Sequence, residues 1–247
     1  MMKILIKIAY DGKNYCGWQV QKNGVSVQGC ICEAAQQVYG VKVNVTGCSR
    51  TDSGVHARAY YCTLEPPTGA PAVPYDRLPT ALNCHLPEDI TVFEARAVED
   101  GFHARYGVKE KTYEYVFDNG LQRDPFLFKR AWHVGKPLDD QAMNEAARGF
   151  VGEYDFSAFM ASGSTVTDTV RKITDASVRR EGDRVIFKVT GNGFLYNMVR
   201  IMAGTLYYVS IGKIEKTAIP EVIKSGDRTR AGITAPPDGL YLASVTY

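Results

Sequence analysis

The sequence predicts an α+β fold built on a mainly antiparallel sheet. Stretches in which apolar and polar residues alternate occur along the whole chain, mixed with stretches of helical periodicity. The order is not the regular strand–helix–strand succession that a parallel sheet requires, and some strands follow one another as hairpins. The 247 residues suffice for one large domain or two smaller ones. We expect two halves, residues 1–100 and 101–247.

The first half is expected to hold four strands and two helices. Residues 3–8, 41–46, 59–64 and 90–98 are the predicted strands. Ser26 is a suitable N-cap for a helix over residues 27–39, and Gly40 a suitable stop. A short helix is expected around residues 75–83, whereas residues 66–74 are too rich in Pro and Gly for regular structure.

The second half begins with an alternating strand over residues 111–117, which places Tyr113, Tyr115 and Phe117 on one face. A helix over residues 138–150 is expected to be capped by Asp139 or Asp140 and to stop at Gly149. The remaining expected elements are a hairpin of residues 171–180 and 184–190, an apolar helix, a short helix over 217–224 and a last strand over 240–247.

The composition is that of an ordinary globular protein, with 45% hydrophobic and 23% charged residues. A net charge of +2 permits an anionic partner, but a nucleic-acid surface would have to be a local patch. The apolar stretch at the N-terminus is too short for a signal peptide. The six cysteines form no C-x-x-C pair, so we expect reduced, mostly buried residues of a cytoplasmic protein rather than disulfides or a metal site.

One arginine stands out. Arg200 lies in the middle of residues 191–212, GNGFLYNMVRIMAGTLYYVSIG, which is otherwise almost apolar enough to span a membrane. A span needs about 20 apolar residues, and here Arg200, two asparagines and several glycines interrupt the run, so a buried helix is expected. A guanidinium is always charged and is costly in apolar surroundings unless paired, which predicts a carboxylate partner elsewhere in the chain.

The candidate partner is Asp52, in the polar loop GCSRTDSGVHARA of residues 47–59. In one interpretation Asp52 caps a turn. In a second, Asp52 and His56 form a metal pair, although no further His or acid nearby completes the ligand set. In a third, Asp52 is a catalytic carboxylate that Arg200 keeps ionised and oriented, as a nucleophile or base requires.

Basic and aromatic residues interleave over residues 102–115, FHARYGVKEKTYEY, which include Arg105 and Tyr113. This mixture suits phosphate binding and base stacking, but an ordinary strand edge with lysines is an equal alternative. The chain has no dinucleotide fingerprint, since position 196 is Tyr where the pattern needs Gly, and no P-loop or Gly-x-Ser-x-Gly elbow.

Several motifs together resemble the tRNA pseudouridine synthase A family, in the same order and over nearly the whole chain. They are YDGKNYCGWQVQ (10–21), SVQ (26–28), RTDSGVHA (50–57), NCHLPEDI (83–90), FHARY (102–106), KTYEY (111–115), EYDFSAF (153–159), GFLYNMVRIMAGTL (193–206) and TAPPDGLYL (234–242). Two positions depart from the family: Ser49 stands where glycine usually precedes the Arg-Thr-Asp sequence, and Cys48 is not typical of the motif. If position 49 requires a positive φ, the serine would disturb the loop.

The resemblance implies an isomerase that converts uridine to pseudouridine at positions 38, 39 and 40 of the tRNA anticodon stem-loop, without cofactor or metal. It implies two similar α+β halves meeting at a central catalytic cleft, and a homodimer that binds tRNA and no membrane. Asp52 corresponds to the essential aspartate, Tyr113 to the tyrosine against the target base, and Arg200 to the basic partner of the aspartate.

Further RNA contacts are expected from Arg50, His56 and Arg105, through flanking phosphates or the space that the flipped base leaves. Two other functions stay open at this point. One is an RNA-binding module that has lost the chemistry, and the other is a metal-dependent hydrolase that uses Asp52 and His56.

Overall fold

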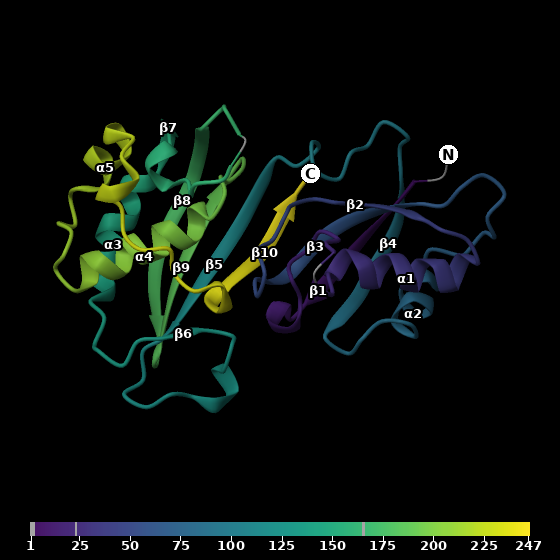
Figure 1. Cartoon of the computed structure of the whole chain (residues 1–247), viewed down its shortest axis with the longest axis horizontal. Coiled ribbons are helices and arrows are strands. Elements are labelled where there is room, and N and C mark those ends of the chain that lie inside the picture. The colour runs from purple at the N-terminus through teal and green to yellow at the C-terminus, as the bar shows by residue number, and fades with distance from the viewer. Residues whose placement is uncertain (1–2, 23, 165) are drawn as a thin grey trace. The chain divides into compact units, whose positions relative to one another are not determined.

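The computed structural model describes residues 3–22, 24–164 and 166–247. The chain forms two compact units (Figure 1), of which the first comprises Met1–Lys109 and Leu242–Tyr247 and the second Glu110–Tyr241. The contacts thus divide the chain after Lys109, whereas the sequence suggested a division near residue 100. The last strand begins in the second unit and ends in the first.

The first unit is a small antiparallel sheet with two helices. Its strand order is β4-β1-β3-β10, with β2 paired to β3, and the pairs β1–β3, β1–β4 and β2–β3 are antiparallel. Its elements are β1 (Lys3–Tyr10), the 3-10 turn Gly12–Asn14, α1 (Val27–Tyr39), β2 (Asn44–Gly47), β3 (His56–Glu65), α2 (Leu78–Asn83), β4 (Ile90–Val98) and β10 (Leu240–Thr246). Ser26 caps α1 by accepting the Gly29 N–H, and Gly40 ends it at φ +69°, as predicted.

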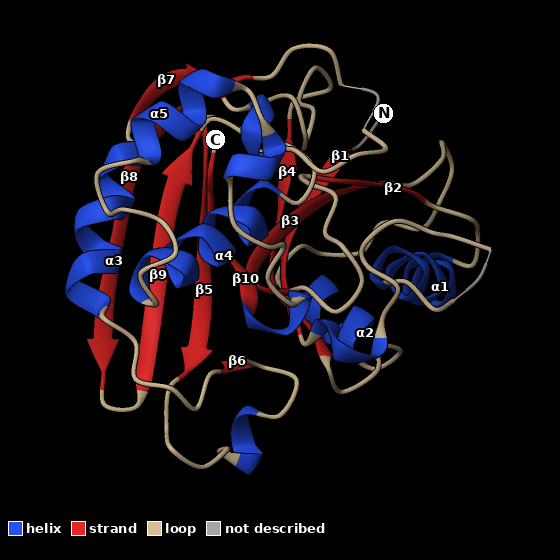
Figure 2. Ribbon diagram, turned by 60° about the vertical axis from the view of Figure 1, so that its left-hand side comes forward, coloured by secondary structure: helices blue, strands red, loops and turns tan. Residues whose placement is uncertain are grey.

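The second unit is a four-stranded antiparallel sheet in the order β5-β9-β8-β7, with the short β6 parallel to β5. Helix α3 packs on β8 and on α4, and α4 also contacts β5, so both helices cover the sheet (Figure 2). The elements are β5 (Glu110–Asp118), β6 (Trp132–His133), α3 (Asp140–Ala147), β7 (Gly152–Asp155), β8 (Val170–Glu181), β9 (Arg184–Gly191), α4 (Met198–Ser210) and α5 (Ile219–Ser225).

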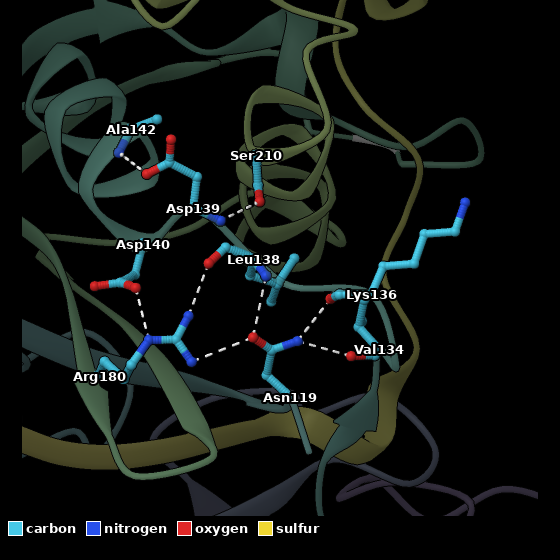
Figure 3. Close-up of polar contacts among 9 residues, drawn as sticks. All are labelled: Asn119, Val134, Lys136, Leu138, Asp139, Asp140, Ala142, Arg180 and Ser210. Carbon is cyan, nitrogen blue, oxygen red and sulfur yellow. Dashed lines mark hydrogen bonds and ion pairs between the residues drawn. The ribbon is translucent and has the colours of Figure 1, made fainter. Parts of the chain in front are cut away.

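A polar network joins β5, β8 and α3 in the second unit (Figure 3). The side-chain oxygen of Asn119 accepts the Leu138 N–H at 3.1 Å and Nη1 of Arg180 at 3.2 Å, and its amide nitrogen donates to the Val134 carbonyl at 2.8 Å. Arg180 also donates to the Leu138 carbonyl at 2.7 Å and to Asp140 at 2.6 Å. These bonds hold the start of α3 against the end of β5. They therefore fix both ends of the connecting segment, residues 119–139.

The predicted α+β class with mainly antiparallel pairing is confirmed. Every predicted element is present, α1 and β4 with the predicted ends and the others with shifted ends. The strand expected over residues 41–46 is β2, Asn44–Gly47, and β3 begins earlier than expected, at His56. Both His56 and Arg58 therefore lie on a strand rather than in the polar loop. No helix among the described residues is long and apolar enough to cross a bilayer.

The six cysteines are free thiols, as expected, but only two of them are buried. Cys48 and Cys62 lie in the interior of the first unit, whereas Cys84 is exposed and the other three are half-buried. Burial raises the pKa of the Cys62 thiol well above its usual value, which keeps this group protonated and unreactive.

Candidate active site

Asp52 lies in the loop between β2 and β3 of the first unit, and the residue before it is fixed from two sides. The hydroxyl of Thr51 is 2.9 Å from that of Tyr10, and the Thr51 carbonyl accepts the Trp18 N–H at 3.2 Å. Thr51 is itself buried. Both bonds restrict the backbone on the N-terminal side of the carboxylate.

The residues after Asp52 are held in the same way. The Tyr15 carbonyl accepts Oγ of Ser53 at 3.2 Å and the Gly54 N–H at 3.3 Å, while the Asp52 carbonyl accepts the Val55 N–H at 3.1 Å. Gly54 adopts φ +80°, which closes the turn in a conformation that favours glycine. Asp52 is half-buried, and the residues on either side of it are both held by hydrogen bonds.

Two glycines of the first connection allow the backbone to lie directly against this loop. A Cβ added to Gly17, at φ +100°, would stand 2.4 Å from the Thr51 carbonyl oxygen. A Cβ added to Gly12 would stand 1.9 Å from the Val55 carbonyl oxygen. Sequence reasoning missed both residues as site determinants, although the glycines of YDGKNYCGW were the available signal.

Ser49 fits the loop without strain. Among the described non-glycine residues only Lys129 and Asn197 have a positive φ, so position 49 does not need the conformation that would exclude serine. The Tyr60 hydroxyl donates to the Ser49 carbonyl and accepts its N–H at 3.4 Å. Trp18 stacks on the Tyr60 ring at 4.2 Å, which buries this side of the loop.

His56 has a structural role that differs from the expected phosphate contact. Its side chain is only 2% exposed, and its Nδ1 accepts the Gly12 N–H at 3.0 Å and lies 3.1 Å from Oδ1 of Asp11. A ring buried in this way holds the 3-10 turn against β3 and is not on the surface of the first unit. The described residues contain no group of three His, Cys, Asp or Glu that could hold a metal, so the Asp52–His56 metal pair gains no further ligand.

The other basic candidates of the first unit are on its surface. Arg50 is an exposed residue of the Asp52 loop. Arg105 is exposed too, and its guanidinium lies 5.7 Å from the Tyr106 ring centroid. The His103 ring packs on the same tyrosine, with the ring centroids 4.4 Å apart. Tyr106 is 77% exposed, and with His103 and Arg105, which are also exposed, it forms an aromatic and basic surface.

Tyr113 and Arg200 lie in the second unit. Tyr113, on β5, is buried and meets the Phe194 ring edge-on at 5.1 Å. The next residue on the same face, Tyr115, is fully buried and donates its hydroxyl to the Pro236 carbonyl at 2.8 Å. Burial raises the pKa of Tyr115, and the positive charge of Arg200 opposes that shift. Tyr115 and Arg200 donate to the carbonyls of the adjacent residues Pro236 and Ala235.

Arg200 lies in the first turn of α4, because the helix begins only at Met198 and not at the start of the apolar run. The Arg200 side chain is half-buried. Its Nε donates to the Ala235 carbonyl at 2.8 Å, and its Nη1 donates to the side-chain oxygen Oδ1 of Asn197 at 2.8 Å. Asn197 is the N-cap residue of α4 and adopts a left-handed backbone conformation, φ +59°. Arg200 belongs to the second unit and Asp52 to the first, and their pairing stays a prediction.

Comparison with known proteins gives the same family as the motifs. A family model described as tRNA pseudouridine synthase matches residues 6–107 and 146–247. Proteins called tRNA pseudouridine synthase A from Thermoanaerobacter sp. (strain X514) and Acetivibrio thermocellus are each 47% identical to this chain over 247 residues, and one from Clostridium acetobutylicum is 41% identical. All three alignments cover 100% of both chains. The chain therefore belongs to the tRNA pseudouridine synthase family, whose members are isomerases.

Proposed function

We propose that this protein isomerises uridine to pseudouridine in the anticodon stem-loop of tRNA, at positions 38, 39 and 40, with Asp52 as the catalytic carboxylate. The observation that carries the proposal is the fixed loop around Asp52, anchored on both sides by Tyr10, Trp18 and Tyr15, within a segment that the family model matches. An oriented carboxylate is what attack on a sugar carbon, or assistance to its ionisation, requires.

The chemistry exchanges one bond of the nucleotide for another. The N1–C1′ glycosidic bond breaks, the detached uracil turns, C5 bonds to C1′, the C5 proton leaves and N1 gains a proton. Asp52 either bonds to the ribose at C1′ or assists formation of a glycal, and in both routes it must be ionised. The reaction has no redox or phosphoryl step, so we propose that it needs no cofactor and no metal.

The target uridine must leave its helix before it reacts, at a cost of a few kcal/mol. We propose that Tyr113 lies against the extruded base, where stacking on an aromatic ring recovers about 1–3 kcal/mol. Arg200 is the proposed partner that keeps Asp52 ionised. The exposed Arg50 and Arg105 are the proposed contacts to RNA phosphates, whereas buried His56 supports the loop from behind.

The family resemblance further supports a cytoplasmic homodimer in which one tRNA touches both copies. Analytical ultracentrifugation tests the assembly, because the molecular mass of a dimer is about twice the 27.3 kDa of one chain. A single-chain mass at micromolar concentration would remove the homodimer from the proposal without affecting the role of Asp52.

Substitution of Asp52→Asn tests the proposed chemistry. The asparagine keeps the size and polarity of the side chain but cannot act as a nucleophile or base, so release of tritium from 5-tritiated uridine in tRNA should stop while tRNA binding persists. Asp76→Asn, at an exposed aspartate of the same unit, is the matched control and should react at the wild-type rate.

Tritium release by the Asp52→Asn variant would refute the assignment of this residue. Wild-type protein that binds tRNA and releases no tritium would instead favour an RNA-binding module. Loss of activity in EDTA, restored by a divalent cation, would favour the metal-dependent alternative.

A further inference from the structure

A single carboxylate outside the catalytic loop holds the segment that anchors it. Asp89 lies in the connection before β4 and makes three contacts with residues 11–15. Its carboxylate accepts the Tyr15 hydroxyl in a short bond and Nδ2 of Asn14 at 3.0 Å, and its carbonyl accepts the Asp11 N–H at 2.9 Å. Residues 11–15 are thus tied to Asp89 at both of their ends.

The tied segment is the one that grips the residues after Asp52. The Tyr15 carbonyl accepts both Oγ of Ser53 and the Gly54 N–H. At its other end, Gly12 donates to Nδ1 of His56, the first residue of β3. The chain of contacts therefore runs from the Asp89 carboxylate through Tyr15 to the two residues that follow Asp52, over covalent and hydrogen bonds of the first unit alone.

We propose that Asp89 and Tyr15 are positioning residues for the reaction: the Asp89 carboxylate, by holding the Tyr15 side chain, sets the place of the Tyr15 carbonyl and through it the orientation of Asp52. The inference rests on the proposed catalytic role of Asp52. Neither residue touches the substrate in this role, and both act on the attacking group through the loop backbone.

The Tyr15 side chain is suited to transmit this restraint. It is 6% exposed, so its ring is locked by packing and the hydroxyl has one fixed direction. Burial, helped by the bond to Asp89, raises the pKa of Tyr15, so the phenol keeps the proton that it donates. Removing the acceptor would strand a buried hydroxyl, and the segment would shift to find it another partner.

Two variants test the proposal with a split between kcat and KM. Tyr15→Phe removes the hydroxyl and keeps the buried ring, and Asp89→Ala removes the acceptor. Since a displacement of about 1 Å can cost 100-fold in rate, we expect kcat for pseudouridine formation to fall about 10- to 100-fold in each variant, with KM for tRNA changed less than about twofold. Glu94→Gln, which breaks the exposed Lys7–Glu94 pair of the same sheet, is the control and should leave kcat unchanged.

The double variant distinguishes a shared route from general damage. If both residues act through one bond, Tyr15→Phe combined with Asp89→Ala should lower kcat no further than the worse single variant does. Hydrogen–deuterium exchange over residues 50–57 should quicken in all three proteins, because the Gly54 amide loses its fixed acceptor. Asp89→Asn, which keeps one acceptor oxygen for the Tyr15 hydroxyl, should recover most of the kcat.

Losses of kcat that multiply in the double variant would overturn the proposal, as would unchanged kcat in Tyr15→Phe. A rise in KM without a fall in kcat would also overturn it, because the pair would then serve binding. These outcomes are separate from the test of Asp52 itself: if Asp52→Asn stays active, the proposed function fails whatever the Tyr15 and Asp89 variants do.

Discussion

Replacing Gly204 by alanine should destabilise the second unit, although alanine is the better helix former. Gly204 is a buried residue in the middle of α4, and a Cβ built on it would stand 1.8 Å from the Ile233 carbonyl oxygen. The clash is with backbone, so no side chain can turn away to relieve it. The segment around residue 233 would have to move away from the helix.

The expected loss can be worked out from the contacts that join this segment to α4. Alanine favours the helix by about 1 kcal/mol over glycine. Against this, overpacking a tight interior costs about 1–3 kcal/mol. Moving the segment also breaks the buried bond of 2.8 Å from the Gly232 N–H to the Thr205 hydroxyl, at about 1–3 kcal/mol. The net loss is then about 1–5 kcal/mol, and it also loosens the segment whose Ala235 carbonyl holds Arg200.

Urea unfolding followed by far-ultraviolet circular dichroism measures the loss, and hydrogen exchange of residues 198–210 locates it on α4. Gly193→Ala is the matched control, since its Cβ would meet only the Arg171 side chain at an ordinary 3.6 Å. The urea concentration at the midpoint of unfolding should be lower for Gly204→Ala than for the wild type. For the Gly193→Ala control it should equal the wild-type value. A Gly204→Ala protein as stable as the wild type, or more stable, would refute the reasoning from close backbone approach.

Three further outcomes follow from the structure. Arg200→Met should lower the free energy of unfolding by about 1–3 kcal/mol, because the Ala235 carbonyl loses a charged donor, and should reduce pseudouridine formation; a fully stable and active variant would contradict both parts. Gly17→Ala should lower kcat by displacing the Thr51 carbonyl, 2.4 Å from the new Cβ, and unchanged single-turnover kinetics would count against it. Tyr39→Phe should raise the free energy of unfolding by about 1 kcal/mol, since the buried Tyr39 hydroxyl has no hydrogen-bond partner among the described residues. Burial first, and Tyr75 second, raise the pKa of Tyr39 from 10.0 to about 12, so wild-type stability should fall as pH rises from 10 to 12 and the phenylalanine variant should lose less; equal alkaline losses would contradict this.

Most secondary structure followed from neighbouring residues. The N-caps Ser26 and Asp139 accept amides three residues on, so their bonds are encoded within one turn of sequence. The hairpin of β8 and β9 closes at Gly182, which takes φ +59°, as the turn residues indicated. Strand ends were less predictable, since the extension of β3 to His56 depends on its pairing with β1.

The residues of the candidate site were visible in the sequence, whereas the contacts that support them were not. The polar loop with Asp52 and the tyrosine strand with Tyr113 were visible as unusual local combinations. The role of His56 was not, because its burial results from the 3-10 turn at Gly12, which lies 44 residues earlier in the chain. Asp89 escaped notice for the same reason: its partner Tyr15 is 74 residues away.

The sequence by itself determined the fold class, the caps of α1, the position of the candidate catalytic loop and the family. These properties depend on periodicity, on glycine and capping residues, and on motifs that are contiguous in the chain. Only the tertiary structure decided that His56 is a buried support, that Arg200 donates to the Ala235 carbonyl, and that Asp89 holds Tyr15. The physical reason is that each of these contacts joins residues 35 or more positions apart, so their partners are chosen by packing and not by local sequence.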